Sequence, residues 1–177
     1  MRVARTFAFV DLSGFTQFTD LHGDDEAVAV LSQFRAALRA TASDIGVRVA
    51  KWLGDGAMLV SVDTTSLVEA TVSLADQFAD DGMLPLRAGL AAGKVILFEG
   101  DDYTGGAINL AARLCDLAQP LEVLATADIG ELVPDGIAAV DAGEYSVAGL
   151  ARPVEVVRLV HASRFEVTGE TPLPRDT

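Results

Sequence analysis

The feature that most constrains this chain is a carboxylate at the end of an apolar, strand-like run, which occurs twice. Residues 7–10 form one such run and end in Asp11. Asp55 stands between two glycines and separates two further strand-like runs, residues 47–52 and 57–62, as the turn of a β-hairpin. Carboxylates at the ends of buried strands lower the stability of the fold unless a cation or hydrogen-bond donors compensate their charge. The repeated pattern therefore predicts a divalent-metal site suited to phosphate chemistry.

Length and composition favour one domain with a packed core, because the chain has 177 residues and half of them are apolar. No apolar run approaches the roughly 20 residues of a membrane span, and the first residues do not resemble a secretory signal. The single cysteine, Cys115, excludes an internal disulfide and a cysteine-type zinc site, and it fits a reducing compartment. We therefore expect a cytoplasmic protein without membrane insertion.

The formal net charge of −13 limits the possible partners. Such a surface repels nucleic acid and anionic membranes, so we expect neither as a ligand. An anionic substrate would need a local site at which metal ions and basic groups reverse the field. The simpler interpretation, that the charge only keeps the protein in solution, also remains open.

Periodicity places the elements along the chain. Helical spacing of apolar residues predicts helices over residues 24–45, 66–79, 105–118 and 127–132. Strand patterns after the first hairpin cover residues 86–92, 94–98, 122–125, 145–147 and 154–160. Because tight turns as well as helices join the strands, the pattern predicts an α+β fold with an antiparallel or mixed sheet and helices on one face. We expect a domain over residues 1–162 and a flexible, proline-containing tail over residues 163–177.

The helix at residues 105–118 has a polar pair opposite its apolar stripe. Asn109 and Arg113 are four residues apart and therefore lie side by side. A guanidinium next to an amide suits an anion that develops charge, although such a pair is also ordinary on a solvated helix face. Asp102 precedes this helix, and by itself it indicates only a turn.

Taken together, three segments resemble the catalytic domain of the class III nucleotidyl cyclases, the adenylate/guanylate cyclase family. They are residues 9–16 (FVDLSGFT), 51–55 (KWLGD) and 102–113 (DYTGGAINLAAR). They occur in order and with their internal spacing kept, and the resemblance covers about residues 3–160. It implies a ferredoxin-like βαββαβ core with a mostly antiparallel sheet and helices packed on it, extended by a C-terminal α/β segment.

The resemblance also implies the activity and the metal ligands. Asp11 and Asp55 would hold two Mg²⁺ or Mn²⁺ ions per site, with the Leu12 carbonyl as a further ligand. The reaction would be the conversion of ATP to 3′,5′-cyclic AMP and pyrophosphate, by attack of the ribose 3′-hydroxyl on the α-phosphate. The sites would be shared across a homodimer, in which the partner subunit supplies the remaining groups.

Those remaining groups bind the substrate and stabilise the transition state. By resemblance, Lys51 and Asp102 would read the purine, Asn109 would orient the ribose, and Arg113 would stabilise charge on the reacting phosphate. A carboxylate and an ammonium complement the amino group and ring nitrogen of adenine, so ATP is favoured over GTP. Asp101 is the alternative to Asp102, although the spacing to Asn109 favours Asp102.

Two departures from the family pattern affect this interpretation. Residues 93–105 are fewer than in many members and lack room for the usual projecting hairpin. The lysine that usually contacts the triphosphate corresponds here to Ala148, and Arg152 in the same turn could replace it. Arg87 and Lys94 are further basic candidates, although strand alternation does not say which way they face. A catalytically weak or inactive pseudo-cyclase that binds nucleotide or a partner, or a guanylate cyclase, is therefore the alternative function.

Overall fold

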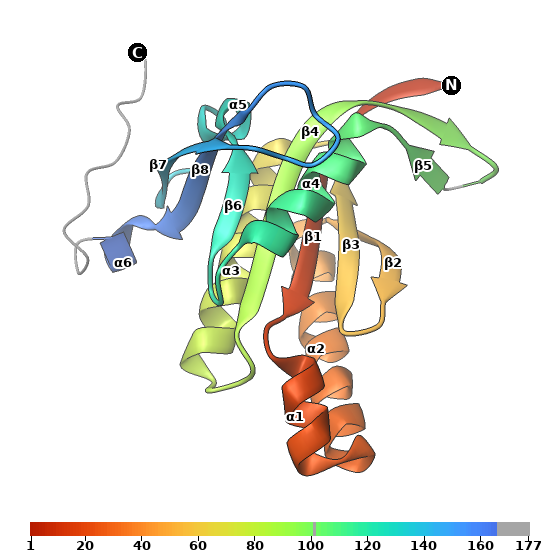
Figure 1. The fold of residues 1–177 in the computed structure, drawn as a ribbon, viewed down its shortest axis with the longest axis vertical. Helices are drawn as coiled ribbons and strands as arrows, with labels where there is room; N and C mark the ends of the chain where they lie inside the picture. The colour runs from red at the N-terminus through yellow and green to blue at the C-terminus, as the bar shows by residue number, and fades with distance from the viewer. Residues whose placement is uncertain (101, 166–177) are drawn as a thin grey trace.

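Within residues 1–100 and 102–165, the part of the chain that the computed structural model describes, eight strands form one sheet. The strands are β1 (Arg2–Leu12), β2 (Arg48–Leu53), β3 (Gly56–Ser61), β4 (Leu86–Phe98), β5 (Asp102–Thr104), β6 (Val123–Thr126), β7 (Ile137–Tyr145) and β8 (Val154–His161). The helices are α1 (Phe15–His22), α2 (Asp24–Ile45), α3 (Thr64–Asp80), α4 (Gly106–Leu117), α5 (Ala127–Gly130) and α6 (Ala162–Phe165), arranged as in Figure 1.

The sheet has the order β2-β3-β1-β4-β6-β8-β7, and β5 pairs with the outer part of β4. Only the β4–β6 pair is parallel among these neighbours. The first four strands and the helices between them form the ferredoxin-like core, and β6 to β8 extend it on one side. The predicted fold class is therefore confirmed.

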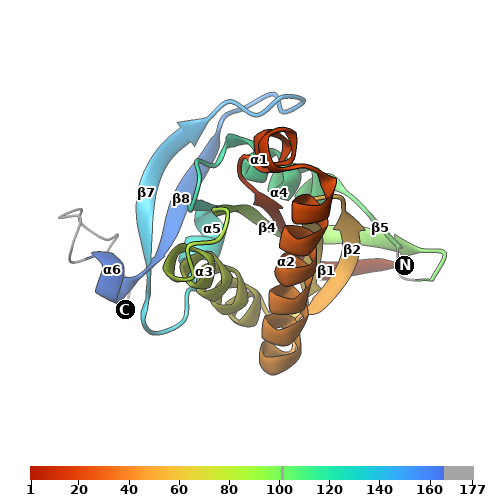
Figure 2. The ribbon, with the colours of Figure 1, turned by 90° about the horizontal axis from the view of Figure 1, so that it is seen from below.

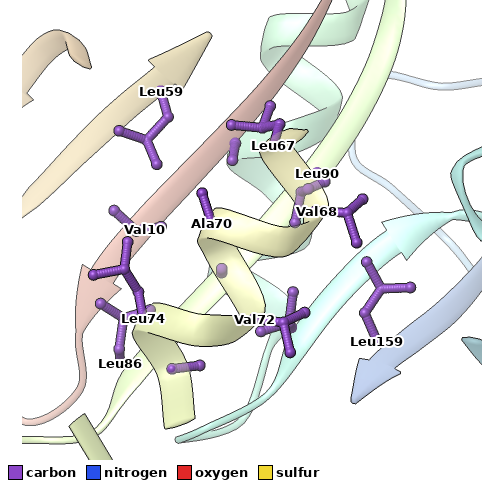
Figure 3. Packing of buried hydrophobic residues seen from close by; sticks show 14 of the residues in the cluster. Val10, Leu59, Leu67, Val68, Ala70, Val72, Leu74, Leu86, Leu90 and Leu159 are labelled. Carbon is purple, nitrogen blue, oxygen red and sulfur yellow. The ribbon is translucent and has the colours of Figure 1, made fainter. Parts of the chain in front are cut away.

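Helices cover both faces of the sheet, so the expectation of a single covered face is wrong. Figures 1 and 2 show α2 and α3 on one face and α4 on the other. The first face buries the largest cluster, in which side chains of α3 such as Leu67 and Leu74 pack against Val10, Leu59 and Leu90 of the strands (Figure 3). The physical reason is visible in β3, which is buried at all six of its positions rather than at alternate ones.

The structure differs from the sequence prediction at one strand and at one hairpin. The predicted strand at residues 145–147 is wrong, because β7 starts at Ile137 and ends at Tyr145. A β-bulge between Asp141 and Gly143 interrupts the alternation of inward- and outward-facing residues in β7. The sequence of β7 therefore lacks the regular period of two that predicts a strand. A short hairpin does form before α4, since β4 turns back into β5 and pairs Phe98 with Asp102.

The C-terminal part of the described chain is attached to α3. Residues 162–165 form α6, within the region expected to begin the tail, and Arg164 pairs with Asp76 at 3.0 Å and Asp80 at 2.6 Å. The rest of the predicted tail lies outside the described residues. No helix of the described chain combines the length and apolar character that crossing a membrane would need.

Candidate functional site

Strand pairing brings the two predicted metal-binding carboxylates to one edge of the sheet. Asp11 of β1 pairs with Gly56 of β3, and Asp55 directly precedes Gly56 in the hairpin turn. The Leu12 N–H donates to the Asp55 carbonyl at 3.1 Å, which extends the pairing beyond the strands. A Cβ at position 56 would lie 2.8 Å from the Val10 carbonyl oxygen and 3.1 Å from Asp11 Oδ1. Only glycine therefore fits beside Asp11.

A cleft of about 380 Å³, which we call the carboxylate cleft, opens at this edge. Asp11, Leu12 and Asp55 line it, together with Arg87 of β4. Arg87 donates from Nε and Nη2 to Asp11 Oδ2, at 3.1 and 2.9 Å. Burial raises the pKa of the Asp11 carboxyl above its usual range; the Arg87 hydrogen bonds oppose this shift, and the charge of Asp55 adds to it.

The donors of the carboxylate cleft fit a hard divalent cation. Two carboxylates and a backbone carbonyl are the oxygen ligands that Mg²⁺ and Mn²⁺ prefer. The nearby negative charge of Asp55 disfavours ionisation of the half-buried Asp11, and a cation between them would relieve this. Among the described residues, no group of three or more His, Cys, Asp or Glu side chains could hold a metal, so further ligands would come from water or substrate.

The second predicted group lies on the outer face of α4. This helix packs directly on β4, because a Cβ at Gly89 would lie 2.2 Å from the Cys115 nitrogen and 2.4 Å from the Ala111 oxygen. Ala111 and Cys115 are buried in this contact, whereas Asn109 and Arg113 are exposed. The predicted division of the helix into an apolar stripe and a polar face is confirmed.

Asn109 and Arg113 line a second cleft, also about 380 Å³, which we call the α4 cleft. Its other wall is the loop of residues 147–150 before β8, and this wall includes Ala148. Arg152 and Lys94 are exposed, and neither lines one of the two clefts. Of these basic candidates for contact with the triphosphate, the structure brings Arg87 to a cleft, beside Asp11.

Lys51 and Asp102 form an ion pair between β2 and β5. The hydrogen bond from Lys51 lowers the pKa of the Asp102 carboxyl. The adjacent Tyr103 fixes β5, since its hydroxyl accepts a hydrogen bond from Arg48 at 3.1 Å and its ring packs edge-on against Phe7. The predicted pair is thus in contact on the surface and lies outside both clefts. Asp101 lies outside the described residues.

Asp116 is a site residue that sequence reasoning missed. It lines both clefts, and its backbone carbonyl accepts a hydrogen bond from Arg87 Nη1 at 3.1 Å. Its side chain lies 3.8 Å from Arg113 Nη1. The available signal was its position three residues after Arg113, which places both on one helix face.

The predicted site residues therefore occupy three separate places in one chain. Asp11, Leu12 and Asp55 lie at the carboxylate cleft, Asn109 and Arg113 lie at the α4 cleft, and Lys51 and Asp102 lie at the β2–β5 surface. A single chain thus does not assemble them into one pocket.

Comparison with known proteins identifies the family. No protein-family model matches this chain. An uncharacterized protein of Mycobacterium tuberculosis is 36% identical over 167 residues, which cover 94% of this chain and 43% of that protein. A pH-sensitive adenylate cyclase of the same organism is 33% identical over 151 residues, covering 83% of this chain and 36% of the cyclase. The chain thus spans less than half the length of these relatives.

Solved structures share the same architecture. The adenylyl cyclase CyaB from P. aeruginosa matches with a TM-score of 0.75 at 26% identity, over 92% of this chain and 96% of that one. The guanylate cyclase domain of RhGC from Catenaria anguillulae shares the fold, with a TM-score of 0.80 at 16% identity over 91% and 98% of the two chains. This chain therefore belongs to the class III adenylyl and guanylyl cyclase domains. Domains of this class bind a nucleotide, generally use divalent metals and typically dimerise.

Proposed function

We propose that this domain is an adenylate cyclase that converts ATP to 3′,5′-cyclic AMP and pyrophosphate, in sites shared between two copies of the chain. The observation that carries the proposal is the convergence of Asp11 and Asp55 at one cleft, on a fold that adenylate and guanylate cyclases share. Relatives named adenylate cyclase favour ATP as the substrate.

The carboxylate cleft would be the metal-binding half of the site. Asp11, Asp55 and the Leu12 carbonyl would hold two Mg²⁺ or Mn²⁺ ions. When bound, these ions would supply activation of the ribose 3′-hydroxyl and neutralisation of phosphate charge. Arg87 offers a further positive charge in the same cleft, so it is the first candidate for contact with the triphosphate.

The α4 cleft would be the half that acts in the transition state. Arg113 has an exposed guanidinium with donors in a planar fork, which suits charge developing on a phosphate. Asn109, one turn earlier on the same helix face, can donate to or accept from the ribose. Both residues would act in a site whose metal-binding half belongs to the other subunit.

Lys51 and Asp102 would read the base. Their mutual ion pair keeps an ammonium donor and a carboxylate acceptor next to each other at the β2–β5 surface. The amino group of adenine would donate to Asp102, and its ring nitrogen would accept from Lys51. Guanine presents a carbonyl where adenine has the amino group, so Asp102 would disfavour it.

The experiment is incubation of the chain with Mn²⁺ and either ATP or GTP, followed by identification of the products. We expect cyclic AMP from ATP and far less cyclic GMP. The control is Asp55→Ala, which should abolish turnover without changing the thermal unfolding transition. Cyclic GMP as the main product would instead identify a guanylate cyclase. Nucleotide binding without any cyclic product would identify a pseudo-cyclase.

A weakly active or inactive form is the second candidate, and one observation favours it. Ala148 lines the α4 cleft at the position where the family usually has a phosphate-binding lysine. A methyl group cannot donate to a phosphate oxygen, and Arg152 is exposed outside the cleft lining. We therefore expect weak binding of the triphosphate unless Arg87 supplies the missing charge.

A further inference from the structure

Two arginines of α2 face the only tryptophan of the chain. Arg35 and Arg39 are four residues apart, and each guanidinium carbon lies 5.1 Å from the centroid of the Trp52 ring. Trp52 belongs to β2 and packs edge-on against the fully buried Phe34, with ring centroids 6.4 Å apart. The indole is therefore anchored to the core while two positively charged guanidinium groups contact its ring.

These two arginines have no acidic partner among the described residues, where no ion pair with a carboxylate includes either of them. Like charges four residues apart on a helix repel each other, and no acidic residue stands three or four positions from either arginine. Acidic residues outnumber basic ones 26 to 13, so this pair is a local region of positive charge in an acidic chain.

The contact with Trp52 leaves the donors of these arginines available. A cation–π contact uses the charge of the guanidinium, whereas its N–H groups still need acceptors. Arg35 Nε is buried and has no hydrogen-bond partner within the described structure. A planar guanidinium fork matches the oxygens of a phosphate or carboxylate. The cluster thus combines uncompensated charge with an unsatisfied donor, and an oxyanion bound on the exposed Arg39 side would compensate the charge.

We propose that Arg35 and Arg39 form a binding site for a phosphate dianion, free or carried on a small molecule, outside both clefts. Two single positive charges match one dianion, which favours phosphate over a single carboxylate. Trp52 directly follows Lys51, and the turn at the end of the same strand carries Asp55. An anion at this site would therefore bind side chains that contact the strand leading to both the candidate base-reading lysine and the candidate metal ligand.

The experiment is phosphate titration of the whole chain without metal or nucleotide, at constant ionic strength. Calorimetry measures binding, and Trp52 emission locates it, because no other tryptophan contributes. We expect one saturable isotherm and an emission change that follows it. Arg39→Gln should weaken the affinity by about tenfold or more, since it removes a charge-assisted contact. Arg39 is exposed, so this variant should keep its fold, which circular dichroism checks.

Two controls separate this site from other basic residues. Arg2→Gln makes the same charge change at an exposed position of β1 and should leave the isotherm unchanged. Arg113→Gln removes the α4-cleft guanidinium and should also leave the Trp52 response unchanged. Equal phosphate binding by the parent chain and Arg39→Gln would overturn the proposal, as would no saturable binding. Binding of a glutamate-rich peptide but not of phosphate would overturn the assigned ligand class.

Discussion

The two clefts of this domain have the same volume, about 380 Å³, yet they are built in different ways. The carboxylate cleft is formed where paired strands of the core end, and its acidic residues are held by backbone register and by Arg87. The α4 cleft is formed by exposed side chains of one helix and by a loop. The proposed metal-binding end is therefore part of the fold itself, whereas the proposed phosphate-binding end can change with single surface substitutions.

The largest expected effect tests whether the two clefts serve different active sites. Asp55→Asn and Arg113→Gln should each lower kcat about 10²- to 10³-fold. The first weakens binding of the metal ions and the second removes a guanidinium, so each takes positive charge away from the transition state. In an equal mixture of the two variants, half the dimers would be mixed, and each mixed dimer would have one intact site. We therefore expect recovery to about one quarter of the parent activity for a two-fold symmetric dimer.

Cyclic AMP formation in the mixture measures this recovery. Each variant mixed with itself at the same total concentration is the control. No recovery, with both variants folded and dimeric, would mean that one chain supplies a complete site.

The next effect concerns the α4 cleft, the proposed phosphate-binding end of the site. Ala148→Lys should lower the KM for ATP about tenfold, because a charge-assisted hydrogen bond is added in the α4 cleft. Steady-state kinetics measures it, and Ala151→Lys in the same loop, outside the cleft lining, is the matched control. An unchanged KM would show that another group already neutralises the triphosphate.

A smaller effect tests how Arg87 maintains the carboxylate cleft. Its hydrogen bonds lower the pKa of Asp11, which burial raises, so Arg87→Gln should raise that pKa. Protons would then compete with metal at higher pH, and the acid limb of Mn²⁺ binding should move up by about one pH unit. Electron paramagnetic resonance of free Mn²⁺ measures this limb. Lys94→Gln, an exposed change on the same strand, should leave it in place, and equal limbs in both variants would contradict the prediction.

The smallest expected effect is a loss of folding stability, caused by removing a helix cap that lies outside both clefts. Asp63 caps α3 by accepting from the N–H groups of Thr65 and Ser66, at 3.3 and 3.2 Å. Asp63→Ala should cost about 1 kcal/mol of unfolding free energy at neutral pH. The hydrogen bonds from Ser66 lower the pKa of Asp63 in the folded protein. The cap therefore contributes its full stability at pH values above the ordinary aspartate pKa. That contribution is lost as the pH falls through the lowered pKa of the folded state.

Urea unfolding of this variant at neutral and acidic pH measures the difference, which should shrink in acid. Asp81→Ala, at the other end of α3, removes the same charge and should cause no such loss, because a carboxylate is unfavourable near a helix C-terminus. An equal loss in both variants would show that the cap is not the cause.

Local periodicity predicted the long elements well. The helix predicted over residues 24–45 is α2 with the same bounds, and the hairpin around Asp55 forms as predicted. The failures have physical reasons: the bulge in β7 breaks its alternation, and central strands buried on both faces give no sign of which face a helix covers. Likewise, Arg87 was recognised as basic, but its direction depends on how β4 pairs with β1.

By itself, the sequence determined which chemical groups this protein carries and how neighbours along one element are arranged. Asp11 ends an apolar run, Asp55 lies in a turn between two glycines, and Asn109 and Arg113 share one helix face, because strand and helix periods follow from the backbone. Only the tertiary structure decided which groups meet: Arg87 with Asp11, Lys51 with Asp102, and two clefts that share only Asp116. Those contacts join residues far apart along the chain, and the packing of elements on the two sheet faces sets them.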